Sequence, residues 1–223
     1  MLQRFFDIVF STIATILLSP LLIIVMIILK FTGEGEIFYV QPRVGYDGKI
    51  FNLLKFATML KNSPNMGTQT VTVKDDPRVL PFGKFLRKTK INELPQLFNI
   101  LMGDMSIIGP RPQAKRCFLA FDKKTQDTIT KVKPGLSGIG SIVFRDEESM
   151  LDNHKSDRLD FYDKIIAPYK GELESWYIKH KNIYTYFWLI FMTIWVVLKP
   201  DSKIYHRFKD LPKVKNSELK RYI

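Results

Sequence analysis

Cysteine and histidine are scarce in this chain. A single cysteine, Cys117, stands among 223 residues, so no internal disulfide bond can form. The absence of an internal disulfide bond fits a domain in the reducing cytoplasm. The three histidines, His154, His180 and His206, lie far apart and lack the spacing of metal ligands. With no internal repeat and no low-complexity segment, the length suits one compact domain with membrane-attaching segments.

Acidic residues are also under-represented. The chain has 22 Asp and Glu against 34 Lys and Arg, which gives a net charge of +12. Such an excess attracts nucleic acids, anionic lipid head groups or nucleotides. Because no zinc-finger spacing or RNP-like aromatic motif is present, we expect no nucleic-acid partner. Two strongly apolar segments, and the basic tail after Lys199, indicate anionic membrane lipids instead.

The first apolar segment, residues 5–29, is long enough to cross a hydrocarbon core of ~30 Å. No small-residue cleavage site follows it, so we do not expect a secretory signal peptide. Ser19-Pro20 interrupts it, because proline deletes a backbone hydrogen bond that Ser19 can partly replace. A spanning helix and a re-entrant helix of two short legs both fit. The basic residues after Lys30, together with Arg4, prefer the cytoplasmic side, which supports the re-entrant form.

The remaining chain reads as α+β, mainly helical with a small β-hairpin. Asp47-Gly48 is a hairpin turn signal between two short apolar runs. Residues 61–76 are polar and rich in turn formers, which predicts a loop that could cover a site. Ile183 to Leu198 is apolar on every side but only about 24 Å long as a helix, so we expect it in the head-group zone.

Residues 86–112, LRKTKINELPQLFNILMGDMSIIGPRP, carry most of the chemistry. Pro95 fits the first turn of a helix and Gly103 fits its end. Asn92 would then act as an N-cap, with Glu93 beside it. A helix start with three nearby cations favours an anion, although a solvated charge run fits equally well.

This stretch resembles the signature of the bacterial sugar transferase family, the small monotopic phosphoglycosyl transferases. DPRVLPFGKFLRKT, which leads into this stretch and overlaps its start, and KPGLSG after it also match the family, in the same order. The resemblance implies transfer of a sugar phosphate from a nucleotide diphosphate sugar, with UDP as the nucleotide, to polyprenyl (undecaprenyl) phosphate. It also implies Mg²⁺ as cofactor, the cytoplasmic face of the inner membrane, and a re-entrant helix broken at Ser19-Pro20.

The resemblance also implies three parts and several functional residues. The parts are a re-entrant membrane helix (1–32), a cytoplasmic catalytic domain (33–182) and an interfacial helix with a basic tail (183–223). Lys55, Arg87 and Arg111 would bind substrate phosphate, and Glu93 would ligate magnesium or act as the nucleophile. Exposed apolar helices would allow two copies to associate as a homodimer.

One departure from the family concerns the catalytic pair, Asn92 and Glu93. The family carries an Asp nucleophile where this chain has Asn92, and an amide is a poor nucleophile. The lipid phosphate could attack the donor directly, the chain could be an impaired homologue that serves as a membrane scaffold or regulator, or the Asp could have been substituted. Ala57-Thr58-Met59 likewise replaces the family's Arg-Ser-Met. The acids at 146–148 could complete a magnesium site or simply be solvated.

Overall fold

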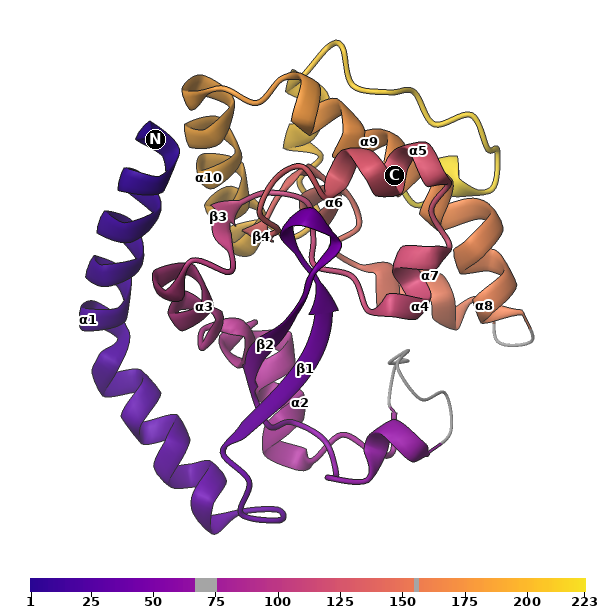
Figure 1. The fold of residues 1–223 in the computed structure, drawn as a ribbon. Helices are drawn as coiled ribbons and strands as arrows, with labels where there is room; N and C mark the ends of the chain where they lie inside the picture. The colour runs from indigo at the N-terminus through magenta and orange to yellow at the C-terminus, as the bar shows by residue number, and fades with distance from the viewer. Residues whose placement is uncertain (67–75, 155–156) are drawn as a thin grey trace.

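The computed structural model describes residues 1–66, 76–154 and 157–223 (Figure 1). Of the loop predicted over 61–76, residues 67–75 lie outside the described residues. The described chain is mainly helical with two small two-stranded sheets, which confirms the predicted fold class. The elements are α1 (Leu2–Phe31), β1 (Phe38–Val44), β2 (Ile50–Phe56), α2 (Pro81–Lys88), α3 (Gln96–Met102), β3 (Ser106–Ile108), α4 (Lys115–Leu119), α5 (Lys123–Ile129), β4 (Gly135–Ser137), α6 (Ile139–Val143), α7 (Glu147–Asp152), α8 (Arg158–Phe161), α9 (Ala167–Lys179) and α10 (Ile183–Leu198).

Helix α1 is continuous through Pro20 and bends near its middle (Figure 1). Ser19 Oγ donates a hydrogen bond to the Ile16 carbonyl at 2.8 Å. That carbonyl is the one left without a helical partner, because proline has no N–H to offer it. The predicted break is therefore a bend within one helix rather than a gap between two. The re-entrant path stays a prediction.

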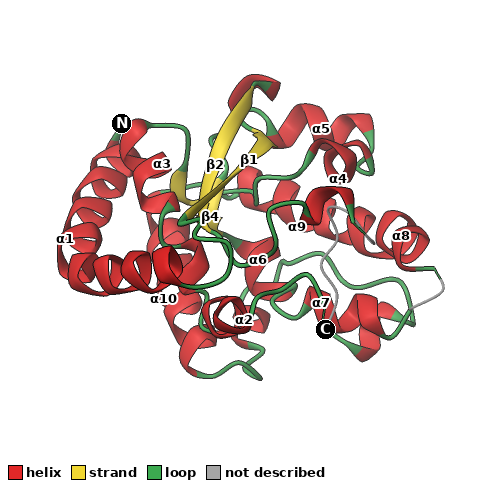
Figure 2. Cartoon of the chain, turned by 90° about the horizontal axis from the view of Figure 1, so that it is seen from below, coloured by secondary structure: helices red, strands yellow, loops and turns green. Residues whose placement is uncertain are grey.

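The N-terminal half of α1 is joined to the protein body by a buried carboxylate. Asp7 is only 2% exposed, and its Oδ1 accepts hydrogen bonds from Ser106 Oγ (3.0 Å), the Ile107 N–H (3.0 Å) and the Tyr186 hydroxyl (2.9 Å). Because Tyr186 belongs to α10, this one side chain ties α1, β3 and α10 together. The two apolar helices accordingly lie side by side in Figures 1 and 2.

The C-terminal half of α1 is held by apolar packing. Leu22, Val25 and Leu29 are buried against Phe56 of β2 and Leu86 of α2. Much of the remaining helix surface is apolar and exposed, and by length and composition α1 could cross a membrane. Large exposed apolar residues on α1 and α10 are Leu2, Phe5, Ile8, Ile13, Ile16, Leu17, Ile23, Ile24, Ile27, Phe31, Ile183, Tyr184, Phe187, Phe191, Ile194, Val197 and Leu198.

The β1–β2 hairpin crosses the centre of the molecule (Figure 2). Its turn is the predicted one: Asp47 and Gly48 both adopt positive φ, at 57° and 71°. Strands β3 and β4 form a short parallel pair in which Ser106 faces Gly135 and Ile108 faces Ser137. Gly109 follows β3 and lies so close to the 133–135 backbone that a Cβ there would come within 2.6 Å of the Lys133 carbonyl. This close approach fixes the Pro110-Arg111-Pro112 corner.

The main core is formed largely by α6, α9 and α10, and Phe6 and Phe10 of α1 pack against it. Ile139, Ile166, Leu173 and Leu189 are fully buried there. The tail after α10 returns to this core and buries Tyr205, Leu219 and Ile223 in it. Asp76 and Arg78 form a buried ion pair of 2.6 Å.

Candidate functional site

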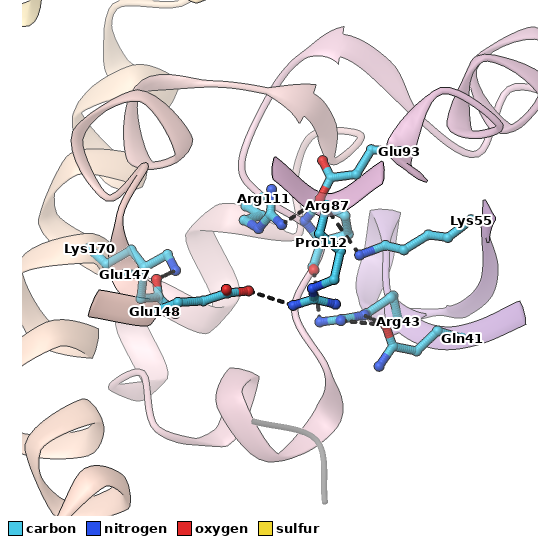
Figure 3. Close-up of polar contacts among 10 residues, drawn as sticks. All are labelled: Gln41, Arg43, Lys55, Arg87, Glu93, Arg111, Pro112, Glu147, Glu148 and Lys170. Carbon is cyan, nitrogen blue, oxygen red and sulfur yellow. Dashed lines mark hydrogen bonds and ion pairs between the residues drawn. The ribbon is translucent and has the colours of Figure 1, made fainter. Parts of the chain in front are cut away.

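Lys55, Glu93 and Arg111 converge from three separate elements (Figure 3). Lys55 comes from β2, Glu93 from a 3-10 turn over Ile91–Glu93, and Arg111 from the corner after β3. Glu93 Oε1 lies 3.8 Å from Lys55 Nζ and 3.1 Å from Arg111, which donates a hydrogen bond to it. The structure therefore brings together three of the residues that the sequence predicted.

The cluster is largely buried, and its charges perturb one another. The side chains of Lys55 and Glu93 are only 16% and 15% exposed. Burial would raise the pKa of Glu93, but the positive charges of Arg111 and Lys55 outweigh it and lower that pKa to about 2. Burial lowers the pKa of Lys55 to about 7, although Glu93 counteracts it. The charge of Glu93 raises the pKa of Arg111.

Arg43 is a further cation of this site that sequence reasoning did not single out. It donates hydrogen bonds to Gln41 Oε1 (3.1 Å from Nε) and to the Pro112 carbonyl (3.3 Å). Burial, followed by the charge of Arg111, lowers the pKa of Arg43 to about 10. Strand alternation could have located it, because residues 39, 41 and 43 share one strand face and Tyr39 pairs with Lys55.

Arg87, at the end of α2, reaches the same region but forms an ion pair with Glu148 of α7 (Figure 3). Glu147, its neighbour, pairs instead with the buried Lys170. The acids at 146–148 therefore do not form one cluster, and no group of three Asp, Glu, His or Cys that could hold a metal occurs among the described residues. Glu147 and Glu148 each pair with a different cation, and a magnesium site over these acids stays one of the two possibilities that the sequence offers.

Asn92 is buried (6% exposed), but it does not cap a helix. Helix α3 has Pro95 at its N-cap and no side-chain cap, because the 3-10 turn intervenes between Asn92 and the helix. The N-cap prediction is therefore wrong, whereas the predicted helix end at Gly103 is confirmed. Asn92 Oδ1 is buried without a hydrogen-bond partner among the described residues. An oxygen in that position is available to a donor or a cation brought by a ligand.

This arrangement suits a doubly charged oxyanion. Arg43, Lys55 and Arg111 surround one carboxylate, so positive charge remains in excess in a place where water screens little. Planar guanidinium groups and an ammonium group are the usual partners of phosphate. The site can therefore bind phosphate groups and stabilise negative charge that develops on them.

Comparison with known proteins agrees with this geometry. The chain matches the profile described as "Bacterial sugar transferase" over residues 1–200. It is 37% identical over 161 residues to the exopolysaccharide production protein ExoY of Sinorhizobium fredii, covering 66% of this chain and 71% of the relative.

Two longer relatives match more of the chain. An N-acetylgalactosaminephosphotransferase of Aeromonas hydrophila, named for UDP-N-acetylgalactosamine and undecaprenyl phosphate, is 34% identical over 199 residues, 88% of this chain and 44% of the relative. An uncharacterised sugar transferase of Haemophilus influenzae is 32% identical over 215 residues, 90% of this chain and 42% of the relative. The chain thus spans less than half the length of these two relatives. With the family profile covering residues 1–200, the chain belongs to the bacterial sugar transferase family.

Proposed function

We propose that this chain transfers a sugar phosphate from a UDP-sugar to undecaprenyl phosphate at the cytoplasmic face of the inner membrane. The observation that carries the proposal is the buried cluster of Lys55, Arg111 and Glu93 with Arg43 behind it. A diphosphate entering there would meet three cations gathered around the Glu93 carboxylate. Its binding would raise the pKa of Lys55 again and keep that side chain charged. Names of relatives supply the undecaprenyl phosphate acceptor.

The apolar setting of the cluster supports a lipid acceptor. Leu53 and Phe56 lie within two residues of Lys55 on β2, and both are buried in clusters that include residues of α1. The phosphate-binding strand therefore lies directly on the helix whose outer surface is exposed and apolar. A polyprenyl chain lying along that surface would bring its phosphate to the membrane boundary, where a soluble UDP-sugar can reach it.

Attachment of both halves of α1 to one body supports the monotopic, re-entrant arrangement. Asp7 fixes the N-terminal half by hydrogen bonds, and Leu29 packs the C-terminal end against β2 and α2. A helix crossing the bilayer from end to end would place the charged body on both sides of the hydrocarbon or inside it. Cations beside aromatic rings of α10, Lys199 at Trp195 (4.6 Å) and Arg207 at Trp188 (5.2 Å), suit an interface with anionic lipids.

The residues present fit a magnesium ion that arrives with substrate. Mg²⁺ is held in such sites by one or two carboxylates plus phosphate oxygens and water. Glu93 would supply the carboxylate and the unpartnered Oδ1 of Asn92 an amide oxygen. When bound, the ion would neutralise charge on the diphosphate. Lys55 and Arg111 would orient the phosphates in either case.

The geometry favours direct displacement over a covalent enzyme intermediate. An oxygen of the lipid phosphate would attack the β-phosphorus of the donor, and the bond from that phosphorus to the bridging oxygen would break. The products are the undecaprenyl diphosphate sugar and UMP. The amide of Asn92 is a poor nucleophile, and Glu93 is engaged by two cations that reduce its reactivity. Arg111 and Lys55 would stabilise charge on the transferring phosphoryl group.

The test uses the full chain in detergent with undecaprenyl phosphate, Mg²⁺ and a panel of UDP-sugars. We expect UMP release with at least one sugar, and only when the lipid acceptor is present, because direct displacement allows no burst without it. Release without acceptor would contradict direct displacement. Absence of release from every sugar, together with activity in Asn92→Asp, would contradict native catalysis.

That last outcome would favour a second candidate function, a membrane scaffold or regulator that binds nucleotide sugar without turning it over. It is motivated by the amide at Asn92, which leaves the phosphate-binding cations in place but removes the family's nucleophile. Such a chain would bind UDP with the affinity of an active enzyme. UDP binding without turnover, measured by isothermal titration calorimetry, identifies it.

A further inference from the structure

Glu174, on α9, lies behind the Arg111 corner and outside the site described above. Its side chain is only 1% exposed, and its Oε1 accepts a hydrogen bond from the backbone N–H of Arg111 at 3.2 Å. Gly140 of α6 makes room for it, because a Cβ at that position would lie 2.3 Å from Oε1. A buried carboxyl group that holds the backbone of a phosphate-binding residue is more than a packing feature.

We propose that Glu174 is a positioning residue for Arg111: by fixing the Arg111 backbone N–H, it sets where the guanidinium lies relative to Glu93 and to substrate phosphate. This inference rests on the proposed function for its consequence, but its geometry is independent of the reaction. Arg43 completes the restraint from the opposite side through the Pro112 carbonyl. The backbone of the corner is thus held at two consecutive residues, and the Arg111 guanidinium extends from it to Glu93.

The charges around Glu174 explain how it can hold Arg111 without neutralising it. Lys170, four residues earlier on α9, is paired with Glu147 of α7. Glu174 Oε2 has no hydrogen-bond partner among the described residues. Burial raises the pKa of Glu174 to about 7, against the opposing effects of the Arg111 N–H, Lys170 and the Arg111 charge. Its uncharged form would still accept the backbone hydrogen bond, and the guanidinium charge would remain directed at Glu93.

The experiment measures binding of UDP and of inorganic pyrophosphate to the full chain, and UMP release, for four single variants and for Glu174→Ala in an Arg111→Gln background. Glu174→Ala removes the acceptor, Glu174→Gln retains an oxygen acceptor, and Gly140→Ala displaces the carboxyl without removing it. Glu172→Ala is the matched control, because Glu172 is on the same helix, its side chain is 40% exposed and it pairs with Lys215. Thermal unfolding shows which variants fold. If Glu174→Ala does not fold, Gly140→Ala takes its place in the comparison.

We expect Glu174→Ala and Gly140→Ala to weaken pyrophosphate binding by about tenfold. The loss in kcat/KM would be about a hundredfold, because a small misplacement of a catalytic group is costly. Glu174→Gln should stay within about twofold of wild type near pH 6.5, where the carboxyl is largely uncharged. In an Arg111→Gln background, Glu174→Ala should have no further effect, because Glu174 acts through Arg111.

Additive losses in the Arg111→Gln background, or a Glu174→Gln variant as weak as Glu174→Ala, would overturn the inference. A wild-type chain that binds neither UDP nor pyrophosphate would also overturn the inference. If the wild type releases no UMP but the coupling in pyrophosphate binding is present, only the proposed function fails. If UMP is released and the losses are additive, only the inference fails.

Discussion

Replacement of Lys55 by methionine should stabilise the ligand-free chain while removing its affinity for phosphate. Burial lowers the pKa of Lys55 from 10.5 to about 7. Each pKa unit corresponds to about 1.4 kcal/mol, so the charged ammonium group costs the folded state on the order of 5 kcal/mol. Methionine has a similar length and no charge, and Glu93 keeps its 3.1 Å partner Arg111. If the variant recovers only half of that cost, the midpoint of thermal unfolding should rise by about 5–10 °C.

The stability difference between Lys55→Met and wild type should depend on pH. Below pH 7, Lys55 is charged in both the folded and the unfolded chain, and the full cost applies. Between pH 7 and 10.5 the folded chain has released a proton that the unfolded chain still holds, so wild-type stability rises with pH in that window. The advantage of Lys55→Met should therefore be largest near pH 6.5 and shrink near pH 9.5.

The assay is thermal unfolding in detergent at both pH values, with and without UDP. Lys49→Met is the control, because Lys49 lies on the same hairpin with its side chain 81% exposed. UDP should stabilise the wild type and the control but not Lys55→Met. A Lys55→Met variant that unfolds at a lower temperature than wild type would refute this account. So would a rise in its unfolding temperature that is independent of pH, because the account holds that charged Lys55 destabilises the ligand-free chain and binds phosphate.

Two further substitutions test how α1 is attached to the protein body and whether Arg87 contacts the nucleotide-sugar donor. Asp7→Ala leaves three donors, two of them buried, without this acceptor and should lower the free energy of unfolding by about 3–5 kcal/mol, against about 1 kcal/mol for Tyr186→Phe. Equal losses in thermal unfolding would show that Asp7 does not join the helices. Glu148→Gln releases Arg87 from its ion pair and should lower KM for the donor about threefold with kcat unchanged. An unchanged KM would mean that Arg87 does not contact the donor.

The sequence predicted those features that depend on neighbouring residues. Asp47-Gly48 specified the hairpin turn and Gly103 the end of α3, because both positions require a positive φ that few residues adopt. The two apolar helices followed from their composition. Asn92 was misread because a 3-10 turn and a helix start share the same signals, and only packing decides between them.

The site was predicted in part. Lys55, Glu93 and Arg111 followed from the resemblance, but their meeting depends on how β2 and the corner after β3 pack. Arg43 was recognisable from strand alternation. Glu174 was not, because a glutamate in a charged helix such as α9 has the pattern of a solvated side chain. Its burial depends on a glycine in another helix, Gly140, which no local pattern relates to it.

The central claim is that Lys55, Arg111 and Glu93 bring a nucleotide sugar to a lipid phosphate at the membrane boundary. It is tested most directly by transfer of radiolabelled sugar phosphate from UDP-sugars to undecaprenyl phosphate in nanodiscs. We predict labelled lipid with wild type and with Lys49→Met, and at least a hundredfold less with Arg111→Lys, because an ammonium group cannot replace a bidentate guanidinium. Equal labelling by Arg111→Lys and wild type would contradict the account.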